Sequence, residues 1–167
     1  MECSLCKLEA EMFARIIQRA AISLALVTGG QVYAAPLTYG TYYDEKVSTF
    51  CDSSSAFCRL NFSQLPPDRL LMVRKINCSI SSSLPIAQVI LQISATSGGP
   101  SVSTRTLPLA TPPSQLISGV YFTNFREDTS FLIGQARYPF VVAGAQGGND
   151  VSGFSCTLIG DLVTPIQ

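Results

Sequence analysis

A group of tyrosines and carboxylates near residue 40 has the residue types of a sugar-binding surface. The stretch reads Tyr39-Gly40-Thr41-Tyr42-Tyr43-Asp44-Glu45. Tyrosine rings stack on the C–H face of a sugar, and neighbouring carboxylate oxygens accept hydrogen bonds from its hydroxyls. If the ligand is a glycan, we expect the contact surface to consist of Tyr39, Tyr42, Tyr43 and Asp44. The pattern favours the plainer alternative, a first strand whose tyrosines cover the edge of the core.

Acid–base catalysis would have to rely on carboxylates, because the 167-residue chain contains no histidine. This excludes Ser-His-Asp and Cys-His catalysis and nearly all catalytic zinc sites. A polysaccharide hydrolase needs two carboxyl groups about 5–10 Å apart. The candidates are Glu127 or Asp128 on one side and Asp44 or Glu45 on the other. Adjacent acidic residues are more typical of solvated turns, so we expect no catalytic residue.

The sequence predicts neither a metal site nor a cofactor. Calcium needs six or more oxygen ligands, whereas Gly147-Gly148-Asn149-Asp150 supplies one Asn–Asp pair, so we expect a glycine-rich hairpin turn there. The CxxC pair of Cys3 and Cys6 lacks the second ligand pair of a zinc site and the context of a redox motif. Lys+Arg and Asp+Glu both number 11, so the net charge is zero and nucleic-acid binding is not expected.

Four further cysteines have the even number expected of a disulfide framework in an exported chain. They are Cys51, Cys58, Cys78 and Cys156. Of the three possible pairings we favour Cys51–Cys58, which brackets a polar turn between two strands, and Cys78–Cys156, whose members share the inward phase on two separate strands. Six residues separate the first two cysteines and no histidine is present, which disfavours a metal-bound or redox-active thiol.

Residues 12–34 have the features of a cleavable signal helix. Two arginines precede the apolar run 20–27, which is too short to span a bilayer, and small residues suited to a signal peptidase follow. We expect cleavage before Ala35 and a secreted or periplasmic protein with no membrane span in its mature chain. Residues 1–11 carry the wrong charge for the start of a signal, so we expect translation to begin at Met12.

The elements that must position these side chains are strands. All ten prolines follow the expected cleavage site, and no run has a convincing helical period. Apolar and polar residues alternate in 57–62, 70–80, 86–93 and 154–163, and the runs 102–107, 120–125, 131–133 and 140–143 are further strand candidates. The alternation places Leu70, Met72 and Ala87 on the core side.

Roughly eight such runs separated by Gly, Pro and Ser clusters predict an all-β domain over residues 35–167. We expect an antiparallel jelly-roll-like β-sandwich, with an immunoglobulin-like sandwich as the alternative. The chain has no tryptophan, so the usual immunoglobulin Cys…Trp…Cys pattern is impossible.

These patterns favour an exported, non-catalytic module that binds a glycan or another envelope or extracellular component, or has a structural role there. Two alternatives remain open, namely a small carboxylate-based polysaccharide hydrolase and an inhibitor or subunit that docks to another protein. The absence of histidine, the few and clustered acidic residues and the Ser/Thr-rich surface favour binding over catalysis.

Overall fold

The computed structural model describes residues 35–51, 57–102, 105–147 and 151–166, and in them all regular structure is β-strand. The all-β prediction is therefore confirmed for this part of the chain. The predicted signal helix, the first eleven residues and the Gly148-Asn149-Asp150 part of the expected turn lie outside the described residues.

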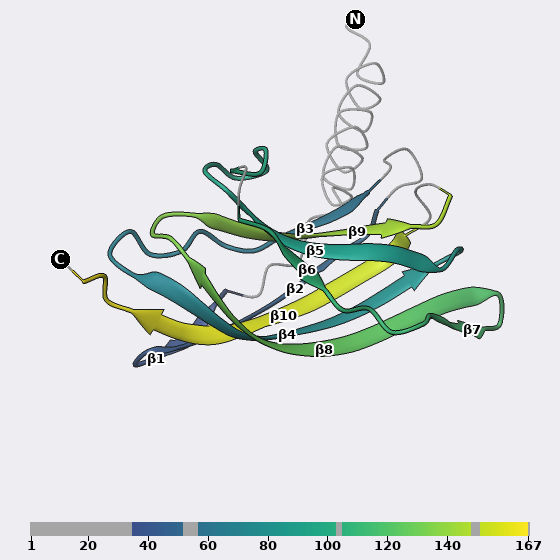
Figure 1. Cartoon of the computed structure of the whole chain (residues 1–167), viewed down its shortest axis with the longest axis horizontal. Coiled ribbons are helices and arrows are strands. Elements are labelled where there is room, and N and C mark those ends of the chain that lie inside the picture. The colour runs from purple at the N-terminus through teal and green to yellow at the C-terminus, as the bar shows by residue number, and fades with distance from the viewer. Residues whose placement is uncertain (1–34, 52–56, 103–104, 148–150, 167) are drawn as a thin grey trace, which may run out of the picture. The chain divides into compact units, whose positions relative to one another are not determined.

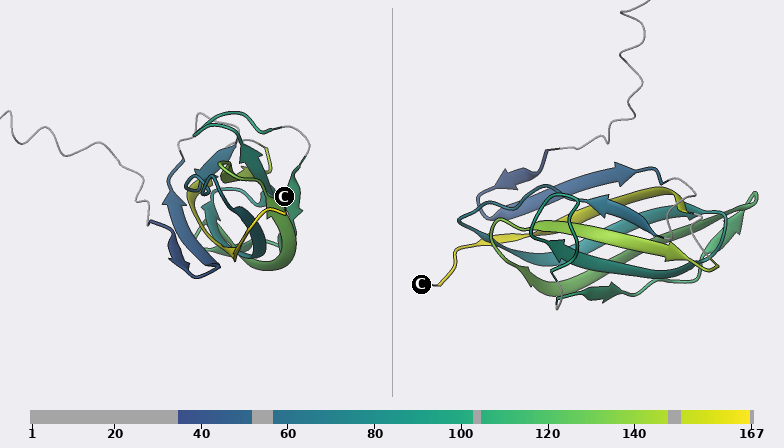
Figure 2. Two further views of the ribbon diagram at one scale, coloured as in Figure 1. Left: turned by 90° about the vertical axis from the view of Figure 1, so that its left-hand side faces the viewer. Right: turned by 90° about the horizontal axis from the view of Figure 1, so that it is seen from above.

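The described strands form two antiparallel sheets, which lie one over the other (Figure 1). Figure 2 turns the same two layers by 90°, and its left view looks along the strands. The large sheet has the order β1 (Leu37–Tyr39), β2 (Tyr42–Thr49), β10 (Val151–Val163), β4 (Leu70–Ser82), β8 (Val120–Ile133) and β7 (Gln115–Ile117). The small sheet has the order β3 (Cys58–Asn61), β9 (Tyr138–Ala145), β5 (Ile86–Ser94) and β6 (Leu107–Leu109).

The core lies between the sheets and follows from the two-residue period of the strands. In β10 the side chains of Phe154, Cys156 and Leu158 are at most 2% exposed, as the alternation predicts. Leu60 and Leu91 of the small sheet are fully buried on the opposite side of the same core. Each such aliphatic side chain stabilises the fold by about 1.5–3 kcal/mol relative to an exposed one.

The expected inward positions of Leu70 and Met72 are wrong, because β4 contains a register shift between Val73 and Lys75. The extra residue of a bulge reverses the phase of a strand. Leu71 and Val73 are consequently buried in the core, whereas Leu70 and Met72 are only partly buried.

A second register shift, between Ile86 and Gln88 of β5, makes the expected burial of Ala87 wrong as well. Ala87 is exposed, and from Val89 onward the predicted inward phase holds. The predicted strand 102–107 is also displaced, since the strand here is β6, Leu107–Leu109.

Both predicted disulfides are present. Cys78 and Cys156 face each other on the neighbouring strands β4 and β10, with their Cα atoms 4.1 Å apart. Cys51–Cys58 joins the end of β2 to the start of β3 and so fastens the large sheet to the small one. Two disulfides are typical of an oxidising, extracellular compartment. In the described residues we find no helix with the length and hydropathy to cross a membrane.

Candidate functional site

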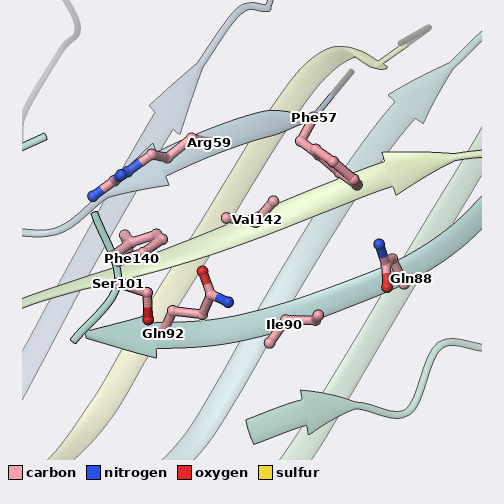
Figure 3. Close-up of a pocket in the computed structure, with 8 residues that line it drawn as sticks. All are labelled: Phe57, Arg59, Gln88, Ile90, Gln92, Ser101, Phe140 and Val142. Atoms are coloured by element: carbon pink, nitrogen blue, oxygen red, sulfur yellow. The ribbon is translucent and has the colours of Figure 1, made fainter. Parts of the chain in front are cut away.

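A groove of about 410 Å³ lies on the outer face of the small sheet, on the side away from the core (Figure 3). Its lining comes from β3 and the residue before it, from β5 and β9, and from the segment that follows β5. The lining residues are Phe57, Arg59, Gln88, Ile90, Gln92, Ser101, Phe140 and Val142. A volume of this size is in the range of small-molecule binding sites.

The floor of the groove is apolar because of the register between β5 and β9. Ile90 lies opposite Val142, and both side chains are only partly buried on the outer face. The outer face of an antiparallel sheet normally carries polar side chains that contact water. An apolar centre on this face is therefore a feature that the core does not require.

Phe57 forms one end of the groove, and its ring lies directly against the backbone of Gly144. A Cβ atom at Gly144 would be 2.9 Å from Cδ1 and Cε1 of Phe57. A side chain larger than that of glycine at position 144 would displace the ring. Phe57 is 50% exposed, so about half of the residue is accessible to a ligand.

Arg59 and Phe140 form the other end of the groove, as Figure 3 shows. The guanidinium carbon of Arg59 is 3.5 Å from the centroid of the Phe140 ring. Arg59 Nε donates a hydrogen bond to Asn61 Oδ1 and its Nη1 donates one to Gly99 O, both at 2.7 Å. Partial burial lowers the pKa of Arg59, but an arginine stays charged at neutral pH. The guanidinium is thus held on three sides.

Two buried polar atoms in the wall of the groove have no hydrogen-bond partner among the described residues. They are Arg59 Nη2 and Ser101 Oγ. Gln88 and Gln92 add two amide groups, each with donor and acceptor atoms. The described residues that line the groove thus offer hydrogen-bonding groups beside apolar surface.

The structure divides the tyrosines predicted as a contact surface between the two faces of the large sheet. Tyr39 and Tyr42 lie opposite each other on β1 and β2 and are 89% and 44% exposed. Tyr42 Oη donates a hydrogen bond to Asp44 Oδ2 at 3.4 Å. Desolvation and, to a smaller extent, the Asp44 carboxylate raise the pKa of Tyr42. These three residues form an exposed polar patch, hereafter the tyrosine patch.

Tyr43 lies inside the sandwich and is 1% exposed, so it does not contribute to that patch. Its hydroxyl donates a 2.5 Å hydrogen bond to Oε2 of Glu45, which is itself 1% exposed. The Ser63 hydroxyl and backbone N–H donate to Glu45 Oε1 at 2.7 and 3.0 Å. Burial and the Glu45 carboxylate raise the pKa of Tyr43. This cluster ties β2 to the segment after β3.

The structure does not bring together the candidate carboxylate pairs of a hydrolase. Glu45 and Glu127 lie on one row of the large sheet, and Asp44 and Asp128 lie on the next, with β10 and β4 between them. Three strand spacings separate the backbones of each pair by about 14 Å. The backbones of each pair are therefore further apart than the separation of about 5–10 Å that glycoside hydrolysis requires of the carboxyl groups themselves.

Comparison with known proteins finds no matching family model, no matching curated protein and no matching solved structure. No group of three or more His, Cys, Asp or Glu in the described part of the chain could hold a metal ion.

The residues of the groove were not among the sequence-predicted site residues. A weak signal for them is present in the stretch Val89-Ile90-Leu91-Gln92-Ile93, where Ile90 interrupts the alternation on the outward side. The strand β9 has no polar alternation, so its outward residue Val142 is apolar as well. Both residues lie on the outer face of the small sheet. Only the pairing of β5 with β9 shows that they are neighbours.

Proposed function

We propose that the protein is an exported, non-catalytic module of jelly-roll topology that binds a glycan in the groove of the small sheet. The half-exposed Phe57 ring beside an apolar floor and two glutamine amides is the observation that carries this proposal. The strand orders β2-β10-β4-β8 and β3-β9-β5-β6 support the jelly-roll assignment. Because a fold does not fix a function, the binding proposal rests on the groove.

The composition of the groove suits the two kinds of surface that a sugar presents. The C–H face of the ring would stack on Phe57 and rest on Ile90 and Val142. The hydroxyls would exchange hydrogen bonds with the Gln88 and Gln92 amides, which both donate and accept. The volume of about 410 Å³ fits a ligand of one or two sugar rings.

Export is the second part of the proposal. The signal features of residues 12–34 and the two disulfides both support a secreted or periplasmic location. N-terminal sequencing of the exported protein should give Ala35 as the first residue. Recovery of an intact N-terminus from a cytoplasmic pool would contradict it.

A glycan array tests the binding proposal, using protein purified from the exported fraction of cells that express the whole chain. Phe57→Ala should weaken binding to any glycan hit by tenfold or more, since it removes the open ring and part of the groove wall. Tyr42→Ala is the matched control, because it removes an aromatic ring of similar exposure from the tyrosine patch. Loss of binding in the Tyr42 variant alone would move the site to Tyr39, Tyr42 and Asp44.

A further inference from the structure

A second cavity, of about 240 Å³, lies beside the turn that joins β8 to β9. Ile93, Val102 and Leu132 give it apolar walls, and two arginines complete it together with Gly134. Arg105 comes from the segment before β6, and Arg137 comes from the turn itself. We propose that this cavity binds an oxyanion, namely a phosphate, sulfate or carboxylate group.

The charge around this cavity is uncompensated within the described residues. No acidic residue is among those that line it. The ion pairs recorded for the described residues use Arg69, Arg74, Lys75 and Arg126 instead. Two guanidinium groups that line one cavity repel each other, whereas an anion bound between them attracts both.

Contacts within the described residues position the Arg105 side chain and the backbone of Arg137. The Arg105 guanidinium lies 5.4 Å from the centroid of the Phe131 ring. The backbone of Arg137 is anchored because its carbonyl accepts a 2.9 Å hydrogen bond from Leu65 N. The preceding Ala136 adopts a left-handed conformation, with a φ of 51°, and its N–H donates to Pro66 O. These two hydrogen bonds attach the turn to the segment that follows β3.

Arginine is suited to this role because its planar group makes two parallel hydrogen bonds to an oxyanion. Both arginines are exposed, so the cavity is open to an anion from solution. The cavity is distinct from the groove, since Ile93 points inward whereas the neighbouring Gln92 lines the outer face. The proposal therefore stands independently of glycan binding in the groove.

A ¹⁵N-HSQC titration of the exported protein with inorganic phosphate, at an ionic strength held constant with sodium chloride, tests the proposal. We expect saturable shifts at the amides of Ile93, Gly134 and Arg137. Arg105→Gln and Arg137→Gln should each weaken the affinity about tenfold, as expected for the loss of one charge-assisted contact. Lys46→Gln is the control, because it makes the same charge change on the large sheet.

The proposal is overturned if the shifts do not saturate, or if Lys46→Gln weakens binding as much as the arginine variants do. The spectrum itself reports whether each variant is folded, and Arg105→Lys and Arg137→Lys preserve the charge while removing the bidentate geometry. Titrations with glucose 6-phosphate and glucuronate distinguish the source of the anion. Tighter binding of glucose 6-phosphate than of inorganic phosphate assigns the site to a sugar-borne phosphate, and equal binding assigns it to the free anion.

Discussion

The outer faces of the two sheets differ in chemistry although both point away from the core. The face of the large sheet carries polar side chains that pair across neighbouring strands, such as Arg74 with Asp161 and Ser48 with Ser155. The face of the small sheet has Ile90 and Val142 at its centre instead. The large-sheet face also carries partly buried apolar side chains, such as Met72 and Ile159, whereas Ile90 and Val142 of the small sheet line the groove.

The difference supports the proposal that the small-sheet face binds a ligand. The alternation rule explains the polar pairs of the large sheet, because residues that do not pack on the core are free to be polar. It does not explain why the small sheet keeps an aromatic ring, an aliphatic floor and a tethered guanidinium outside the core. Exposed apolar surface that forms a groove is typical of binding sites. Variants matched between the two faces test whether the groove is the site.

The largest expected effect is on binding when a charge enters the apolar floor. Ile90→Lys should weaken glycan binding at least 100-fold, equivalent to about 2.7 kcal/mol, because the ligand would cover an unpaired ammonium. Its effect on stability should be small, since Ile90 is only partly buried and the lysine can extend into water. Ser79→Lys, on the exposed face of β4, should change neither quantity.

Binding on the array and urea unfolding of the same preparations check this prediction together. If Ile90→Lys unfolds the protein while leaving the glycan affinity of the folded fraction intact, the apolar floor serves folding rather than binding. If Ser79→Lys abolishes binding, the two faces are not functionally different.

The next largest expected effect is on the stability of the fold, and it should differ between two adjacent tyrosines. Tyr43→Phe should destabilise the fold by about 1–3 kcal/mol, because the buried Glu45 carboxylate loses a donor. Tyr42→Phe, on the outer face of the same strand, should change the free energy of unfolding by less than about 0.5 kcal/mol. Equal effects in urea unfolding would mean that the inner hydrogen-bonded cluster is not a structural contact.

The same tyrosine predicts a loss of stability in alkali. Burial, and then the Glu45 carboxylate, raise the pKa of Tyr43 above the ordinary value of 10.0. The folded state therefore holds the phenolic proton at a pH at which the unfolded state releases it. The contribution is fully present below about pH 10 and falls by up to about 1.4 kcal/mol per pH unit above it. Unfolding measured from pH 8 to 11 should show a flatter profile for Tyr43→Phe.

A smaller effect on binding is expected from glycines on the two faces. Gly144→Ala should displace the Phe57 ring, because the new methyl carbon would lie 2.9 Å from it, and should weaken glycan binding about tenfold. Gly153→Ala on β10 of the large sheet is the control, since its Cβ would meet the Ser81 hydroxyl. Unchanged binding in Gly144→Ala would show that the position of the Phe57 ring is irrelevant to the ligand.

The sequence was sufficient for the fold class and for the disulfide pairs, because both depend on local periodicity and on strand phase. The alternation of β10 gives Cys156 the same phase as Leu158, and both are buried. The sequence was insufficient to predict the burial of Leu70 and Met72. The bulge before Lys75 depends on pairing with β8 and has no signature in the local sequence.

The groove could not be predicted from the sequence for a related reason. Phe57, Ile90 and Phe140 are far apart in the chain and become neighbours only through the order β3-β9-β5. The tyrosines near residue 40 were predicted to form one contact surface because they are adjacent in sequence. Adjacent residues of a strand, however, point to opposite faces of the sheet. Tyr43 accordingly lies in the core while Tyr42 is exposed.

The smallest expected effect concerns the ion pairs of the large sheet. Arg74→Gln breaks the 3.0 Å pair with Asp161, whose side chains are 57% and 38% exposed. Solvent screens such a pair, so the free energy of unfolding should fall by about 0.2–1 kcal/mol at low salt and by less at 0.5 M sodium chloride. Glycan binding in the groove should be unchanged, because the substitution lies on the opposite sheet. A loss of glycan affinity in Arg74→Gln would show that the polar face contributes to binding. That result would contradict the proposed difference between the two faces.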